Sequence, residues 1–269
     1  MTAQIERHIQ WYPGHMAAAM RRVDQLIGLI DIIIEVIDAR LPRSGTSKAL
    51  SKISGRRPRL IVLTREDLAD PQATVKWLMS YERSGQRALA VNAKQPKGAK
   101  KISTELHRLA GQSKNKQRRA IVVGVPNSGK STVINALCRR AVAATENRPG
   151  RTRGVQWFRL EPSLELMDTP GILAPKIESA QSQWMLAITG AIPAQRYDPE
   201  EVVTQFTAWL RRRENKEDRF PDLAQFAVQR GMKPTGDMHN AARSYIKALN
   251  EGVFGRISFE EPADDGKAA

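Results

Sequence analysis

The stretch GVPNSGKST (124–132) lies near the middle of this 269-residue chain, and its pattern decides the fold. It matches G-x-x-x-x-G-K-[ST], a phosphate-binding loop that needs a strand before it and a helix after it. The branched apolar run RAIVVGV (119–125) predicts that strand, and STVINALCRR (131–140) predicts the helix. In such a loop backbone N–H groups surround the phosphates, Lys130 reaches the outer phosphates, and Ser131 ligates magnesium. The predicted nucleotide contacts are Asn127, Ser128, Gly129, Lys130, Ser131 and Thr132.

Short apolar runs alternate with helical stretches on both sides of this loop. Four of them predict strands, DIIIEVID (31–38), RLIVLT (59–64), ALAVNA (88–93) and RAIVVGV (119–125). VQWFRL and LELMD (155–168) predict a hairpin, and helical spacing predicts a helix after Gly14. This alternation predicts an α/β domain over residues 1–175, with a mostly parallel, doubly wound sheet.

Strand signals stop at about residue 175, and helical patterns replace them. The predicted helices are SQWMLAI (182–188), EEVVTQFTAWLRRR (200–213), PDLAQFAVQ (221–229) and HNAARSYIKAL (239–249). A small all-helical C-terminal domain is therefore predicted over 176–269. Trp157, Trp184 and Trp209 lie at apolar strand or helix spacings, so we expect them in the core.

The chain is strongly basic, with 43 Lys and Arg against 28 Asp and Glu and a formal net charge of +15. Such an excess favours polyanionic partners, and nucleic acid first among them. Any single basic cluster is equally compatible with a solvated surface, but the total charge favours a nucleic-acid partner. The basic clusters are GRRPR (55–59), KQPKGAKK (94–101), KNKQRR (114–119), RPGRTR (148–153) and RRR (211–213).

Composition also excludes several classes of protein. The most apolar segment, IGLIDIIIEVID (27–38), is interrupted by Asp31 and Glu35 and is too short for a membrane span. A single cysteine, Cys138, excludes an internal disulfide framework. The N-terminus has neither a signal core nor a transit-peptide composition, so we expect a cytoplasmic protein without a membrane partner.

A second motif, Asp168-Thr169-Pro170-Gly171, ends a predicted strand about 40 residues after the phosphate loop. The Asp168 carboxylate can hold magnesium through water, and the Gly171 amide can contact the terminal phosphate. Between the two motifs, RPGRTRG (148–154) offers Thr152 as a second hydroxyl on magnesium. A basic surface turn is the alternative interpretation of that segment.

A GTPase also needs N-K-x-D and S-A-K motifs that read the base, and neither follows Gly171. Upstream, strand 59–64 ends in Thr64-Arg65-Glu66-Asp67, and strand 88–93 ends in Asn92-Ala93-Lys94. The motif order is therefore circularly permuted, with the base-reading half before the phosphate loop. Permutation leaves parallel packing intact, because it changes only which strands are connected.

The motifs together resemble the circularly permuted ribosome-assembly GTPases of the RbgA/YlqF family. The resemblance covers nearly the whole chain, through HIQWYPGHMAAAM, IDARLP, GVPNSGKST, RPGRTRG, DTPGIL, TGAI and GRISFEEP. It implies a GTPase, using GTP, GDP and Mg²⁺, that binds a late precursor of the large ribosomal subunit and promotes its maturation. It also implies that the helical domain contacts rRNA. No obligate protein partner is evident.

One departure concerns the base. The family usually has Asn-Lys where this chain has Thr64-Arg65. Asp67 is retained, and its carboxylate accepts from both guanine N–H donors, a pattern that adenine lacks. Thr64 can offer a hydroxyl to the base edge, and the Arg65 stem can cover its face. The backbone of Asn92-Ala93 can supply the contact to the base oxygen, so we expect guanine preference with altered affinity.

The residue that handles the attacking water is the remaining question. Ile172 occupies the position where many GTPases place a water-orienting glutamine. His15, beside the Pro13-Gly14 turn, is the candidate catalytic residue, a role that the family resemblance also implies. Asn127 resembles the asparagine of potassium-stimulated GTPases, which suggests K⁺ as a further cofactor; its turn preference explains it equally well. Asp38 and Arg40 are expected to form a structural pair.

Two other functions remain open from the sequence. One is a nucleotide-dependent rRNA-binding module with negligible hydrolysis, in which His15 would have no catalytic role. The other is an ATP-using enzyme, which the altered Thr64-Arg65 motif permits.

Overall fold

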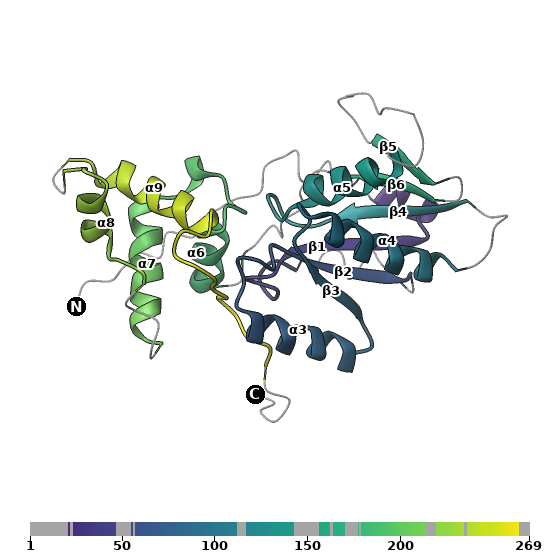
Figure 1. Cartoon of the computed structure of the whole chain (residues 1–269), viewed down its shortest axis with the longest axis horizontal. Coiled ribbons are helices and arrows are strands. Elements are labelled where there is room, and N and C mark those ends of the chain that lie inside the picture. The colour runs from purple at the N-terminus through teal and green to yellow at the C-terminus, as the bar shows by residue number, and fades with distance from the viewer. Residues whose placement is uncertain are drawn as a thin grey trace. The chain divides into compact units, whose positions relative to one another are not determined.

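The structure is a computed structural model of the whole chain (Figure 1). It describes residues 21, 24–46, 55, 57–111, 117–142, 156–161, 164–169, 177, 179–213, 219–233 and 236–263. These residues form two compact units, one containing the described residues of 24–169 together with 258–263, the other containing those of 177–257. We call them the sheet unit and the helical unit. Among the described helices, none is long and apolar enough to cross a membrane.

The sheet unit is built on six strands. They are β1 (Ile32–Asp38), β2 (Arg59–Thr64), β3 (Arg87–Val91), β4 (Arg118–Val123), β5 (Gln156–Glu161) and β6 (Leu164–Asp168). Their order is β3-β2-β1-β4-β6-β5, and every neighbouring pair is parallel except β5 with β6. The predicted α/β fold with a mostly parallel sheet and a terminal hairpin is confirmed.

This order explains how a permuted chain closes its sheet. β4, which carries the phosphate loop, lies between β1 and β6 in the interior of the sheet. The strands that precede the base-reading motifs, β2 and β3, lie beyond β1 on one side, and the hairpin lies on the other. In a parallel sheet the carboxyl ends of the strands share one edge. Motifs that are far apart in sequence are therefore brought to the same edge.

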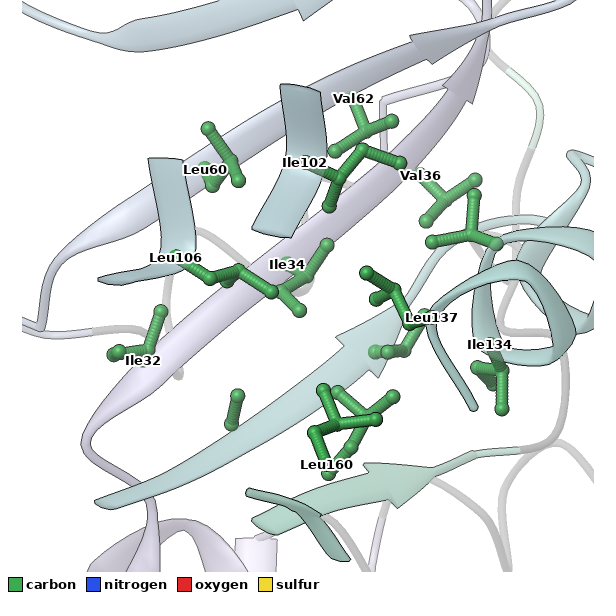
Figure 2. Packing of buried hydrophobic residues seen from close by; sticks show 14 of the residues in the cluster. Ile32, Ile34, Val36, Leu60, Val62, Ile102, Leu106, Ile134, Leu137 and Leu160 are labelled. Carbon is green, nitrogen blue, oxygen red and sulfur yellow. The ribbon is translucent and has the colours of Figure 1, made fainter. Parts of the chain in front are cut away.

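Both faces of the central strands are buried, which explains their continuous apolar sequences. All seven residues of β1 are buried, and successive side chains point to opposite faces. Ile32, Ile34 and Val36 pack on one face against α4 (Pro96–Ala110) and α5 (Lys130–Val142), as Figure 2 shows. Burial of a side chain such as Ile102 or Leu106 stabilises the fold by about 1.5–3 kcal/mol each.

The opposite face is covered by α3 (Pro71–Arg83), whose Trp77 packs against Ile37, Ile61 and Leu63. The helix begins where Asp70 accepts hydrogen bonds from the backbone N–H groups of residues 72 and 73. A proline in its first turn costs no helical hydrogen bond. The Glu35 carboxylate of β1 is also buried, and it pairs with Arg59.

The helical unit contains α6 (Ala180–Ile188), α7 (Pro199–Arg211), α8 (Leu223–Gln229) and α9 (Met238–Asn250). Aspartates cap two of them: Asp198 accepts from the N–H of Glu200, and Asp222 forms a reciprocal capping box with Gln225. The core is aromatic, and several of its ring pairs are edge to face; the rings in these pairs include Phe206, Phe220, Phe226, Tyr245 and Phe254. The predicted helical C-terminal region is confirmed as a fold feature.

The three tryptophans expected in the core differ in exposure. Trp184 is buried against Phe206, as expected. Trp209 is half-buried and carries the Arg213 guanidinium over its ring. The expectation for Trp157 is wrong, because it is 39% exposed. It lies on β5 at the edge of the sheet, with the Arg119 guanidinium 5.4 Å from its ring centroid, so a charged group packs over the ring.

The last described residues leave the helical unit and pack on the sheet unit, although the sequence placed 176–269 in one helical domain. We call residues 258–261 the return segment. Its Phe259 N–H donates to the Arg40 carbonyl at 2.8 Å, and the Trp77 indole donates to the Glu260 carbonyl at 3.1 Å. The Glu260 carboxylate accepts from the Arg43 N–H at 2.7 Å. These bonds make the segment part of the sheet unit.

Candidate nucleotide site

The phosphate loop joins the end of β4 to the start of α5. Its first residue, Gly124, has φ +155°, and a Cβ there would lie 2.2 Å from the Val36 carbonyl oxygen of β1. The close approach of loop and strand therefore requires glycine. Ser128 and Lys130 are buried, whereas Asn127 and Ser131 are exposed. The loop thus presents a mixture of backbone and side-chain donors at the carboxyl edge of the sheet.

Lys130 lies inside the loop. Its ammonium group donates to the carbonyls of Val125 at 2.8 Å and Gly124 at 3.2 Å. Burial lowers the pKa of Lys130 to about 8, and the negative charge of Asp168 opposes that shift. An anion placed at the loop would favour the charged ammonium and raise this pKa again.

Asp168 ends β6 beside the loop. Burial raises its pKa above the usual value, while the charge of Lys130 and the backbone N–H of Thr169 act in the opposite direction. The Thr169 hydroxyl donates to the Val122 carbonyl of β4 at 2.6 Å, which fixes the end of the strand against the loop. Because Mg²⁺ takes oxygen ligands, the Asp168 carboxylate at this strand end is a suitable ligand for the ion.

The turn after β2 contacts the phosphate loop directly. Thr64 is buried, and its hydroxyl donates to the Ser128 carbonyl at 2.6 Å. The Arg65 guanidinium donates to the Asn127 carbonyl at 3.0 Å and to the Asp38 carboxylate at 3.0 Å. The structure therefore brings the first two residues of the predicted base-reading motif to the loop itself.

Asp67 is exposed in the turn that follows. The neighbouring Glu66 was not singled out from the sequence, yet it joins the two base-reading turns: its carboxylate accepts from the Asn92 N–H at 3.0 Å. The Asn92 side chain in turn accepts from the Lys94 N–H at 3.0 Å. The only sequence signal for this contact was the glutamate inside the T-R-E-D motif. The sequence alone does not show which turn the carboxylate of that glutamate contacts.

Two further predicted contacts, Ala93 and Thr132, line one cavity of about 490 Å³. The turn after β3 and the first turn of α4 form one side of this cavity. The start of α5 forms the other side. Gly98 of α4 lies so close to the turn that a Cβ would be 2.4 Å from the Asn92 carbonyl oxygen. The other lining residues are Lys94, Gln95, Pro96, Ala99, Asn135, Ala136 and Arg139.

Asp38 and Arg40 form the expected structural pair, with bonds of 3.0 Å from Nε and 2.8 Å from the second guanidinium nitrogen. Burial alone would raise the pKa of Asp38, but the charge and hydrogen bonds of Arg40 and the charge of Arg65 hold it below its usual value. The sequence did not indicate that Arg65 contacts this pair.

Three predicted site residues lie outside the described residues: the catalytic candidate His15, the magnesium candidate Thr152 and the phosphate contact Gly171. The remaining predicted contacts lie at the ends of β2 and β6, in the turns after β2 and β3, in the phosphate loop after β4 and in the first turn of α5, all at the carboxyl edge of the sheet. The arrangement can hold a nucleotide with its phosphates at the start of α5, where the N-terminal end of a helix favours anions.

Comparisons with known proteins identify the relatives of this chain. A model of the family described as 50S ribosome-binding GTPase matches residues 119–217. The Ribosome biogenesis GTPase A of Priestia megaterium is 36% identical, with 95% of this chain and 98% of the relative covered. That of Thermotoga maritima is 32% identical, with 95% of each covered.

Solved structures agree with these relatives. GNP-bound YlqF from Thermotoga maritima matches with a TM-score of 0.70 at 29% identity, covering 92% of this chain and 99% of that one. The GDP-bound form of the same protein matches with a TM-score of 0.69 at 29% identity, covering 91% and 100%.

Proposed function

Because this chain belongs to the ribosome biogenesis GTPase A family, we propose that it binds the precursor of the large ribosomal subunit and promotes its late assembly. The chain is a GTPase of ribosome biogenesis and binds guanine nucleotides. The single observation that carries the proposal is the match to Ribosome biogenesis GTPase A over 95% of the chain. The match includes helical and sheet units alike, so the assembly function is proposed for the chain as a whole.

The proposed nucleotide contacts follow the geometry. The phosphates are held by Lys130 and by the amides of Asn127, Ser128 and Gly129. Thr132, at the start of α5, lines the same cavity as Ala93. Asp67 accepts from the guanine edge, while the backbone of Asn92-Ala93 contacts the base oxygen. Gly171 senses the terminal phosphate.

Magnesium is proposed to bind Ser131, Thr152 and Asp168. The ion would neutralise charge on the outer phosphates, and the protein would hold it by oxygen atoms only. The half-buried Asp168, whose carboxylate interacts with the Lys130 charge, supports this proposal, because a divalent cation would favour the ionised carboxylate. Potassium at Asn127 is a further proposal, supported by the exposure of that side chain on the loop.

Hydrolysis is proposed to depend on His15. The Ile172 side chain cannot hydrogen-bond a water molecule, so a polar side chain from elsewhere must orient the nucleophile. We propose that the rate is slow alone and rises when the ribosomal particle is bound, because a catalytic imidazole acts only when it is held close to the attacking water. A cytoplasmic location accords with the proposed role in ribosome assembly.

The rRNA contact is proposed to be electrostatic. The net charge of +15 supports it, and in the helical unit Arg212 and Arg213 lie at the end of α7 beside half-buried Trp209. A protein that neutralises phosphates releases counterions, so its affinity falls steeply as salt increases.

Sedimentation of the GTP-loaded protein with large subunits, over a salt series from about 50 to 200 mM, tests this proposal. We expect co-sedimentation that weakens steeply along the series, and weaker binding to small subunits at every salt concentration. Equal binding to both subunits, or an affinity independent of salt, would contradict the proposed partner and its mode of recognition.

A further inference from the structure

The two residues that begin the base-reading motif direct their polar atoms at the phosphate loop. The Thr64 hydroxyl lies 2.6 Å from the Ser128 carbonyl oxygen and 3.2 Å from that of Ile37. Both neighbours are acceptors, so the single hydroxyl proton of Thr64 is committed to the main chain. Thr64 is also only 1% exposed. Its hydroxyl therefore has no proton left to donate to a base.

Arg65 reaches the same loop from the neighbouring position. One guanidinium nitrogen donates to the Asn127 carbonyl at 3.0 Å, and another donates to the Asp38 carboxylate at 3.0 Å. A planar guanidinium can make both bonds at once, because its N–H groups point in fixed and separate directions. The side chain therefore bridges the loop and the end of β1.

Asp38 is a rigid anchor for that bridge. It is 4% exposed and forms a bidentate pair with Arg40, which is fully buried. The Arg40 carbonyl accepts the Phe259 N–H of the return segment at 2.8 Å. Arg65 thus contacts a carboxylate whose position is already fixed by Arg40.

The backbone indicates that this contact is needed. Arg65 and Asn127 both have φ +56°, in the left-handed region that residues other than glycine rarely adopt. Such conformations persist where the surroundings hold them. The Arg65–Asn127 hydrogen bond joins these two residues to each other.

We propose that Arg65 is a positioning residue that, with Asp38, clamps the turn after β2 to the phosphate loop and so fixes the distance between base recognition and phosphate binding. The proposal rests on the proposed roles of Asp67 and the phosphate loop in nucleotide binding. Arg65 acts through the two loops, and Asp67 alone in this motif selects the base. This assignment replaces the sequence-based expectation that Arg65 covers the base face.

Removing the clamp is expected to weaken binding without changing the choice of base. Arg65→Met keeps the aliphatic stem and loses both bonds, so we expect affinity for GTP and GDP to fall about tenfold. Inosine triphosphate lacks the amino group that Asp67 recognises, and its affinity relative to GTP is expected to stay within about twofold of the wild-type ratio. Arg65→Lys is expected to recover part of the loss, because an ammonium cannot reproduce the two-armed contact.

Equilibrium binding of GTP, GDP and inosine triphosphate to full-length wild type, Arg65→Met and Arg65→Lys tests the clamp. Arg108→Met is the matched control, because Arg108 is exposed on α4 away from both loops and is expected to bind like wild type. Arg65 is partly exposed, with 31% of its side chain accessible, so its variants are expected to fold; thermal unfolding without nucleotide checks this. Asp38→Asn, alone and with Arg65→Met, completes a cycle in which the two losses are expected not to add.

The clamp is overturned if Arg65→Met binds GTP within about twofold of wild type, or if Asp38→Asn and Arg65→Met act additively. A change in the GTP to inosine triphosphate ratio as large as the loss of affinity would instead give Arg65 a base-reading role and also overturn it. Equal affinity of wild type for GTP and inosine triphosphate would contradict the proposed role of Asp67, and that result is independent of the loss caused by Arg65→Met.

Discussion

At the scale of single residues, the charges around the phosphate loop are set by burial as much as by their partners. Lys130 donates to two loop carbonyls, yet its pKa is lowered to about 8, because neutral acceptors compensate only partly for lost water. The lysine therefore changes its protonation state close to physiological pH before anionic phosphates arrive. A dependence of nucleotide binding on pH follows.

Nucleotide affinity is expected to fall as pH rises above about 8. Below that pH Lys130 is already charged. Above it, the Lys130 amine must take up a proton when the nucleotide binds, because bound phosphates raise the lysine pKa. The loss approaches about tenfold per pH unit until the pKa of the bound state is reached. Isothermal titration in buffers of different ionisation enthalpy should show proton uptake at about pH 8.5 and little from this group near pH 6.5.

Lys130→Arg is the control for this prediction. Its guanidinium stays charged over the whole range, so the variant is expected to bind more weakly but with a flatter pH profile. It also corrects for titration of the nucleotide itself. Profiles of equal slope for wild type and variant would contradict the assignment.

Asp67 is expected to determine which purine binds. Its carboxylate accepts from two guanine donors, whereas the amide of Asp67→Asn has one donor and one acceptor. That pattern matches xanthine, which has an oxygen where guanine has an amino group. We expect GTP affinity to fall by on the order of a hundredfold or more, and xanthosine triphosphate to bind in its place.

Competition between labelled GTP and xanthosine triphosphate measures this exchange. Asp67→Ala is the matched control, because it should lose GTP affinity without gaining the xanthine nucleotide. Retained GTP preference in Asp67→Asn would show that another group reads the base edge.

At the scale of elements, the return segment stabilises a turn that is remote in sequence. The Glu260 carboxylate accepts from the backbone N–H groups of Arg43 and Ser44, and the Ser44 hydroxyl also donates to it. The neighbouring Glu261 is exposed and pairs with Lys76 at 2.9 Å. A buried side chain that accepts hydrogen bonds from backbone N–H groups contributes more to the free energy of unfolding than an exposed ion pair does.

Glu260→Ala is therefore expected to destabilise the sheet unit by roughly 2–3 kcal/mol, because two backbone donors lose their acceptor. Glu261→Ala, the matched control, should cost less than about 1 kcal/mol. Urea unfolding gives the overall effect, and deuterium exchange of the peptide around residues 41–46 gives the local one. Equal effects of the two substitutions would contradict a specific role for Glu260.

The elements also show what sequence could and could not predict. The run DIIIEVID corresponds to β1 at Ile32–Asp38, and LELMD corresponds to β6, because branched apolar residues between polar turns leave a local signal. The site motifs were located by the strand ends that precede them. The bond from Arg65 to Asp38 and the bond from Glu66 to Asn92 were not predicted, because they join residues whose separation along the chain leaves no periodic pattern.

The return segment was missed for a related reason. GRISFEEP follows a helix, and nothing local to it indicates that Phe259 pairs with Arg40 or that Glu260 reaches Arg43. Trp157 shows the opposite failure, since its strand spacing resembles that of a buried residue. Its exposure depends on its place at the edge of the sheet, which a single strand pattern does not contain.

At the scale of the whole molecule, permutation shapes the proposed switch. The DTPG motif at 168–171 is followed along the chain by the helical unit, and the chain returns to the sheet unit through residues 258–261. Among the described residues, the helical unit is thus inserted between two segments of the nucleotide-binding unit. A change at Gly171 on loss of the terminal phosphate would act on its first connection, which is how nucleotide state could alter particle binding.

The most direct test of this account is GTP turnover by the purified protein, alone and with large ribosomal subunits, in potassium and in sodium, for wild type and His15→Ala. We predict a slow basal rate that rises strongly with subunits in wild type and fails to rise in the variant. Absence of stimulation by subunits in either salt would contradict a ribosome-activated GTPase, and equal stimulation of His15→Ala would remove His15 from the chemistry.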